Sequence, residues 1–189
     1  ELADCLWRAD RFDDAVAHYQ EMLRLNPGDN QGVRYVLLGC LLFLDRNDMS
    51  EKLLAEYEED YSAAWSYCGA LLAFRGEGDS PRARDLLRQA AKVNPHVPDY
   101  MLGNQEMPQD RPAFIGHGDE SEAAYYASAF LRVWKATPGA IPWLRDVLKV
   151  AQPTPTDRGG TKWNRLAADL AELPKDADEV WRQLSAAKA

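Results

Sequence analysis

The stretch GHGDES, residues 116–121, combines side chains that can bind a metal ion. His117 supplies an imidazole, and Asp119 and Glu120 supply carboxylates, which are common ligand types for divalent cations. Two glycines before a predicted helix also suit an anion held on free N–H groups, but the neighbouring carboxylates would repel phosphate. The alternative interpretation is a loop that caps the helix. We expect the capped loop, with no metal and no cofactor.

No catalytic signature occurs elsewhere in the chain. Walker A, GxSxG, HExxH, EF-hand and paired CxxC patterns are all missing from the sequence. Carboxylate runs such as EEDY, residues 58–61, are typical of solvated faces. Arg84, Arg88 and Lys92 form a basic stripe that is either a solvated face or a docking stripe for an acidic partner. We therefore expect a protein that is not an enzyme.

Composition favours one soluble globular domain with a sizeable core. The chain has 189 residues, 46% of them hydrophobic and 28% charged. Its net charge of -8 argues against nucleic acid or an anionic membrane as the main partner. The longest apolar run, residues 35–44, is too short to span a bilayer. The chain opens at Glu1 without a signal-peptide pattern, so it is expected to be a fragment of a longer protein or cytoplasmic as it stands.

The three cysteines show no pairing pattern. Cys5, Cys40 and Cys68 are odd in number and have no CxxC spacing, and each lies in an apolar stretch predicted to be helical. We expect all three to be small buried hydrophobic residues in a reducing, cytoplasmic setting.

Apolar periodicity predicts helices throughout. Residues 12–25 and 80–93 place apolar side chains at three- and four-residue steps, with charged residues between them. Ser80 suits an N-cap and Pro81 the first turn. Alternating strand patterns are scarce, so the expected fold class is all-α.

The dipeptide Asn-Pro ends two of these predicted helices. Pro27 and Pro95 lie 68 residues apart, which is twice a 34-residue period. Ala15 and Ala83 have the same separation, as do Tyr19 and Leu87. Because a residue before Pro leaves the α region, Asn-Pro is expected to stop the helix and to have no further role.

Two tracts carry a helix-pair pattern with small residues at fixed positions. The first is Leu2-Ala3-x2-Leu6 followed by Ala15-x3-Tyr19-x2-Met22-x4-Pro27. The second is Trp65-x2-Cys68-Gly69-x2-Leu72 followed by Ala83-x3-Leu87-x2-Ala90-x4-Pro95. Between them, residues 33–57 supply a middle unit whose small position is expected at Lys52, which makes this unit degenerate.

These tracts resemble the tetratricopeptide repeat family over residues 1–95. The resemblance implies a right-handed helical-repeat superhelix that binds a protein or peptide in the groove formed by its first helices. It places the partner contacts on the first helix of each unit. They are Asp4, Trp7 and Arg8 in the first unit, Leu37, Leu41 and Leu44 in the second, and Ser66, Ala70 and Ala73 in the third. The Lys, Asn and Arg set of the chaperone-binding members is missing.

Beyond Pro95 the repeat pattern loosens. We predict a Pro- and Gly-rich loop at 107–121, a further helix pair to residue 150, a linker at 151–160 and a C-terminal helical extension at 161–189. The helix at 33–44 is apolar nearly all round and must be covered on every side. Either the later helices, which are rich in tryptophan, fold back into the groove, or an external apolar segment docks there. We expect the internal cover. Blocks such as NQGVRY and KATPGAIPWL also resemble bacterial repeat proteins of unassigned function.

Three functions stay open at this point. The expected one is a non-catalytic scaffold for protein–protein interaction. The first alternative is an accessory helical domain of a larger multidomain protein. The second is a small-ligand or metal binder that uses the 107–121 loop. The oligomeric state and the identity of the partner are not predicted.

Overall fold

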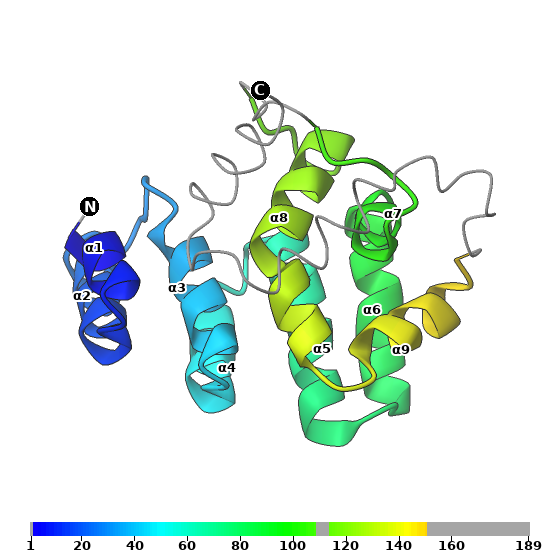
Figure 1. Ribbon diagram of the computed structural model, residues 1–189, viewed down its shortest axis with the longest axis horizontal. Helices are drawn as coiled ribbons and strands as arrows, with labels where there is room; N and C mark the ends of the chain where they lie inside the picture. The colour runs from blue at the N-terminus through cyan, green and yellow to red at the C-terminus, as the bar shows by residue number, and fades with distance from the viewer. Residues whose placement is uncertain (1, 109–113, 151–189) are drawn as a thin grey trace.

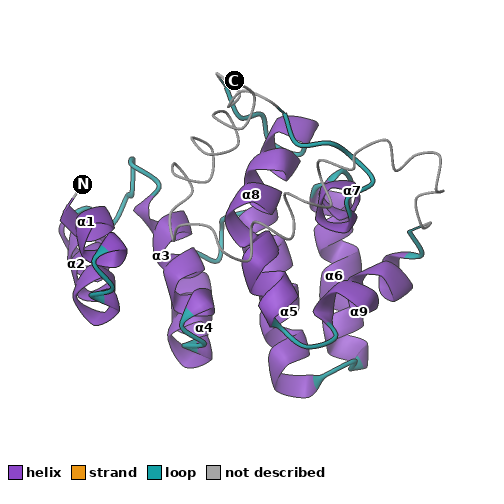
Figure 2. Cartoon of the chain, in the orientation of Figure 1, coloured by secondary structure: helices purple, strands orange, loops and turns teal. Residues whose placement is uncertain are grey.

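The computed structural model describes residues 2–108 and 114–150, and within these ranges the chain consists of nine helices without a strand (Figures 1 and 2). The helices are α1 (Leu2–Arg8), α2 (Phe12–Leu25), α3 (Val33–Phe43), α4 (Asn47–Glu56), α5 (Ala63–Glu77), α6 (Pro81–Val93), α7 (Val97–Leu102), α8 (Glu120–Ala136) and α9 (Ala140–Leu148). The all-α repeat fold is therefore confirmed. None of these helices is long and apolar enough to cross a membrane.

The first six helices form three successive antiparallel pairs. Helix α1 packs on α2, α3 on α4 and α5 on α6, while α2–α3 and α4–α5 contacts join one pair to the next. The turns inside the first two pairs repeat, because Asp10-Arg11 and Asp45-Arg46 lie 35 residues apart and both aspartates have a left-handed φ, 58° and 57°. An aspartate tolerates this conformation better than most residues, so the same turn returns with the same chemistry.

Small residues mark the point where the helices of each pair cross. Ala15 in α2, Ser50 in α4 and Ala83 in α6 are all fully buried. Lys52, which the sequence suggested for this role in the middle unit, is exposed. The middle unit therefore keeps a small crossing residue, two positions before the predicted one. Helix α4 is the shorter of the outer helices, with 10 residues against 14 in α2 and 13 in α6.

Several helix starts follow from capping side chains. The Ser62 hydroxyl accepts from the Trp65 N–H at 3.3 Å, and Ser80 accepts from the Ala83 N–H at 3.0 Å. Pro81 occupies the first turn of α6, where its missing N–H costs nothing. These local signals explain why the predicted start at Ser80 is confirmed.

Helix α8 folds back onto the first helices of the stack. It packs against α3 and α5, and Figure 1 shows it lying along α5 and beside α3. The aromatic ring of Phe130 lies over Gly39, where an added Cβ would stand 3.7 Å from it. Helix α9 then crosses to α6 and α7, and Trp143 stacks on Phe74 at 4.4 Å between ring centroids. The internal cover expected for residues 33–44 is thus present.

This cover is not complete. Val36 on α3 keeps 43% of its surface exposed, although Leu37, Leu38, Leu41 and Leu42 are buried. The expectation that α3 is enclosed on every side is therefore wrong at Val36. Cys40 and Cys68 are buried as predicted, but Cys5 is exposed. Burial raises the pKa of the Cys40 thiol to about 12, so this thiol is uncharged at neutral pH.

The predicted linker at 151–160 and the C-terminal extension at 161–189 lie outside the described residues. Trp163 and Trp181 fall in the same part of the chain. Residues 109–113 of the predicted 107–121 loop also lie outside the description.

Enlarging a crossing residue should destabilise the stack. Ala83→Leu and Ser50→Leu are each expected to lower the free energy of unfolding by about 1–3 kcal/mol, because a well-packed crossing must open to admit the added methylenes. The matched changes Ala17→Leu and Lys52→Leu, at exposed helical positions, should stay within about 0.5 kcal/mol. Urea denaturation followed by circular dichroism measures all four. Equal effects at Ser50 and Lys52 would contradict the crossing assigned here.

Candidate functional site

The inner face of the stack is formed by corresponding positions of α1, α3 and α5. Tyr35, Gly39 and Leu42 correspond to Trp65, Gly69 and Leu72, each 30 residues later. In this register Ser66, Ala70 and Ala73 of α5 correspond to Val36, Cys40 and Phe43 of α3. In α1, Cys5 corresponds to Ala70, and Arg8 corresponds to Ala73. The middle-unit residues predicted from the sequence, Leu37, Leu41 and Leu44, therefore lie one position late.

Exposure along this inner face increases from α5 to α1. Ala70 and Ala73 are 0% and 5% exposed, Cys40 is 7% exposed and Val36 is 43% exposed. Cys5 and Arg8 are exposed, as is Leu2 one turn earlier at 57%. The gradient follows α8, which covers α5 and part of α3. We call the uncovered residues Leu2, Cys5, Arg8 and Val36 the open inner face.

The contacts of α8 place its aromatic residues in the core. Tyr126 packs against Tyr67 at 5.4 Å between ring centroids and stacks on Phe130 at 4.9 Å. Trp134 donates its indole N–H to the Tyr126 hydroxyl at 2.7 Å. Full burial of three such aromatic side chains contributes about 5–9 kcal/mol. That is comparable with the whole stability of a typical domain, so we expect α8 to unfold together with the rest of the protein.

The nine predicted groove residues divide into two groups by accessibility. Five are buried and serve the core: Trp7, Leu37, Leu41, Ala70 and Ala73. Arg8 is exposed, and Asp4, Leu44 and Ser66 are partly exposed. Asp4 accepts a hydrogen bond from the Tyr19 hydroxyl. Its partial burial opposes ionisation, but this hydrogen bond and nearby positive charges lower its pKa on balance. Partner contact at these positions stays a prediction.

The basic stripe on α6 is neutralised by carboxylates of the same chain. Arg84 donates to Asp79 at 2.5 Å and to Asp146 of α9 at 3.0 Å, and Arg88 pairs with Asp85 at 2.9 Å. Lys92 is exposed at the end of the helix. Arg84 therefore ties α6 to α9, and a docking role for this stripe stays a prediction.

The loop before α8 is a cap, as its sequence suggested. The Asp119 carboxylate accepts from the Ser121 and Glu122 N–H groups at 2.8 and 3.1 Å. His117 turns instead toward Glu122, with 3.2 Å between Nδ1 and Oε1. Among the residues that the structure describes, no group of three His, Cys, Asp or Glu side chains is arranged to hold a metal ion.

Glu122 is the residue that sequence reasoning missed. Its carboxylate is 7% exposed and accepts from the Ala63 N–H at 3.0 Å, from the Asn94 side-chain amide at 2.9 Å and from the Gly118 N–H at 2.8 Å. It thereby joins the starts of α5 and α8 to the end of α6. The signal was visible as Asp119-x-x-Glu122, the spacing of a capping box.

Asn94 also has a larger role than the sequence suggested. Its side-chain amide donates to the Asp119 backbone carbonyl at 2.9 Å as well as to Glu122, and its backbone carbonyl accepts from the Tyr67 hydroxyl at 2.8 Å. Asn26, in the other Asn-Pro pair, is exposed and only ends α2. The expectation that Asn-Pro merely stops the helix therefore holds for Asn26 and is wrong for Asn94.

A second buried polar cluster surrounds Arg34 at the start of α3. Its guanidinium donates to Asp29 at 3.0 Å and to Asp60 at 2.8 Å, and it lies over the ring of Tyr35 at 4.5 Å. Burial opposes the charge of Asp60, but hydrogen bonds from Ser62, Tyr35 and Arg34 lower its pKa below the ordinary 3.8. Residue 60 was expected on a solvated face, and this part of the EEDY prediction is wrong. Glu58 and Glu59 are exposed as expected.

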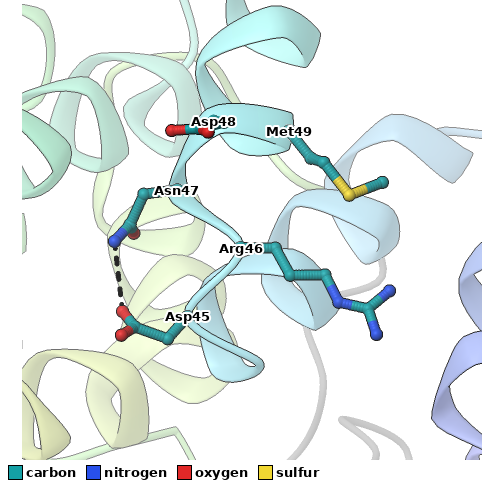
Figure 3. A pocket seen from close by; sticks show the side chains of 5 residues that line it. All are labelled: Asp45, Arg46, Asn47, Asp48 and Met49. Atoms are coloured by element: carbon teal, nitrogen blue, oxygen red, sulfur yellow. Dashed lines mark hydrogen bonds between the residues drawn. The ribbon is translucent and has the colours of Figure 1, made fainter.

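A shallow hollow of about 310 Å³ lies at the turn between α3 and α4 (Figure 3). Its lining residues run from Asp45 to Met49, and Figure 3 shows the hydrogen bond between the Asn47 and Asp45 side chains. Arg75 of α5 donates to the Asn47 side chain at 3.0 Å and to the Leu42 carbonyl at 3.1 Å, while Arg46 pairs with Asp13 of α2. Since these polar groups bind residues of neighbouring helix pairs, the residues around the hollow hold the pairs together.

Removing the Glu122 carboxylate should loosen the inner face. Glu122→Gln keeps the shape of the side chain but leaves buried N–H donors without an acceptor, so the free energy of unfolding should fall by about 2–3 kcal/mol. Glu120→Gln, at an exposed position in the same turn, is the matched control and should change it by less than about 0.5 kcal/mol. Urea denaturation measures both. An unchanged midpoint for Glu122→Gln would rule out this role.

The Arg34 cluster should make stability depend on acid pH. Because the folded pKa of Asp60 is depressed, its contribution is present above the unfolded pKa and is lost as pH falls through the folded value, below about 4. Asp60→Asn should cost about 2 kcal/mol at pH 7, and this cost should shrink progressively as pH falls below about 4. Glu59→Gln is the exposed control. A difference between wild type and Asp60→Asn that stays constant with pH would contradict this account.

Comparison with known proteins agrees with the repeat architecture. The tetratricopeptide repeat family matches residues 6–73. No solved structure gives a significant match to the chain.

Curated relatives come from animals. The protein named Protein ST7 homolog, of Caenorhabditis elegans, is 32% identical over 97% of this chain and 39% of its own length. Suppressor of tumorigenicity 7 protein-like, of Danio rerio, is 29% identical over 74% of this chain and 29% of its own length. Suppressor of tumorigenicity 7 protein, of Macaca fascicularis, is 30% identical over 74% of this chain and 30% of its own length.

The chain thus spans about two fifths or less of each of these relatives. They give no support to the bacterial resemblance suggested by the sequence. The tetratricopeptide family match, residues 6–73, runs from within the first helix pair into α5, and the structure gives this part of the chain a helical-repeat architecture.

Proposed function

We propose that this protein is a non-catalytic scaffold that binds a protein partner on its open inner face. The observation that carries the proposal is the uneven cover of a tetratricopeptide stack. Helix α8 fills the inner side of α5 and much of α3, whereas Leu2, Cys5, Arg8 and Val36 at the other end are exposed.

The chemistry of this face favours a protein ligand. Leu2 and Val36 are two of the few large apolar side chains exposed on the described helices, and Arg8 adds a charge beside them. Exposed apolar groups beside a charged one suit a partner helix or an extended peptide better than a polar metabolite. The acidic net charge still argues against nucleic acid and against an anionic membrane. A cytoplasmic location stays a prediction from the unpaired cysteines.

One observation favours the second candidate, an accessory helical domain of a larger protein. The relatives are more than twice as long as the part of them that this chain matches. On this alternative the partner of the open inner face is another part of the same long polypeptide. The third candidate, a ligand site in the 107–121 loop, has no support from the described contacts of His117 and Asp119, because both serve the start of α8.

Site-specific photo-crosslinking in cells that make the natural protein tests the proposal. A photoreactive amino acid at Cys5 or Val36 should give a discrete protein adduct. The same group at Ala17 or Ala55, exposed on the outer helices α2 and α4, is the matched control and should not. Mass spectrometry of the adduct separates a partner protein from a distant part of the same polypeptide. Failure of both inner positions to crosslink, or identical adducts from the outer ones, would refute an interaction site on this face.

A further inference from the structure

The two ends of the helix stack are closed differently. At one end α9 packs against α6 and α7, and Figure 1 shows α1 and α2 at the opposite end. Three apolar residues are accessible on α1: Leu2 is 57% exposed, and Cys5 and Ala9 are exposed. Their spacing of three and four residues places them on one side of the helix, which we call the end face. A unit that closes a repeat stack needs a polar outer side to stay soluble, and the end face is apolar.

The first helix of each later pair is covered by the second helix of the pair before it. Helix α3 packs on α2, and α5 packs on α4. Trp65 of α5 shows how close this contact is, because its indole N–H donates to the Leu54 carbonyl of α4 at 3.3 Å and its ring lies 6.2 Å from that of Tyr57. No described helix precedes α1 to cover it in the same way. A helix laid on the end face would therefore continue an interface that the chain already forms twice.

An ion pair at the turns fixes how successive pairs meet. Arg46, in the turn between α3 and α4, pairs with Asp13 in the first turn of α2, which belongs to the preceding pair. Arg11 occupies the same place 35 residues earlier, in the turn between α1 and α2. Arg11 pairs with Asp14 of its own helix at 2.7 Å, and these side chains are 62% and 54% exposed. Because such an exposed pair contributes little stability, Arg11 can turn to a carboxylate of another unit at small cost.

We propose that the α1 end of the stack binds a further antiparallel helix pair. Its second helix lies on the end face as α2 lies on α3, and a carboxylate in the first turn of that helix pairs with Arg11 as Asp13 pairs with Arg46. An extended peptide does not combine an apolar helical stripe with a charge at the helix start, so it does not match this surface. The inference rests on the proposed function, because it names the class of partner and because Leu2 and Cys5 also belong to the open inner face.

Photo-crosslinking at Ala9, in cells that make the natural protein, tests this inference. A photoreactive amino acid there should give one protein adduct. Mass spectrometry should place the crosslink in a segment with apolar residues at three- and four-residue steps after an Asp or Glu. Arg11→Glu should lower the yield of adduct at least about tenfold, because it brings two carboxylates together. Arg24→Glu is the matched control and should leave the yield unchanged, since Arg24 forms a similarly exposed pair with Glu21 near the other end of α2.

A charge exchange separates loss of binding from loss of folding. Changing the carboxylate of the crosslinked partner helix to Arg should restore the adduct of the Arg11→Glu variant, which only a folded variant can form. Failure of this exchange to restore the yield would refute the pairing of Arg11 with the partner.

Each other outcome overturns the inference. An adduct at Val36 without one at Ala9 leaves the proposed function intact and removes only the helix pair at the end face. The lack of an adduct at Val36, Cys5 and Ala9 alike removes both. An adduct at Ala9 between two copies of this chain identifies a second copy as the occupant, and an adduct in a segment without helical spacing identifies an extended peptide. An equal loss of adduct in the Arg24→Glu variant shows that Arg11 has no specific role.

Discussion

The placement of α8 against α3 and α5 depends on one buried carboxylate. Glu122 accepts hydrogen bonds from the start of α5, from Asn94 at the end of α6 and from the loop that precedes its own helix. Burying a carboxylate without hydrogen-bond donors would cost several kcal/mol. The first turn of α8 is therefore placed where the N–H donors of Ala63, Asn94 and Gly118 converge. From that point α8 runs along α5 and α3, where Tyr126 packs against Tyr67 and Phe130 lies over Gly39.

Further polar contacts hold the other units of the stack in register. Arg34 joins the α2–α3 and α4–α5 connections through Asp29 and Asp60, and Arg75 joins α5 to the α3–α4 turn and to Thr137 after α8. The small buried residues Ala15, Ser50 and Ala83 let each pair pack closely, but close packing of this kind is not directional between units. The guanidinium groups supply the directional part, since each reaches fixed acceptors on neighbouring units.

The sequence predicted the helical repeats well because their periodicity is local. Ser80, Pro81 and Asp119 fixed helix starts through their own backbone neighbours, and each of these signals is found in the structure. The inner-face residues of α3 were placed one position late, because the short α4 hides the true spacing between units. Asn94 and Glu122 meet across 28 residues, and Arg34 and Asp60 across 26. The capping-box spacing places Glu122 at the start of α8, but no local pattern reports its contact with Asn94 or that of Arg34 with Asp60, so these contacts emerge only from the fold.

Within the described residues, α8 covers the inner side of α5 and part of α3, and it leaves Leu2, Cys5, Arg8 and Val36 exposed. The central claim is that α8 belongs to the core and is not a removable lid. Amide hydrogen exchange of the complete chain tests it most directly. The account predicts that amides of α8 around Ala127–Leu131 exchange as slowly as those of α5, through global unfolding. Exchange of α8 at the rate of a surface loop, while α5 stays protected, would contradict it.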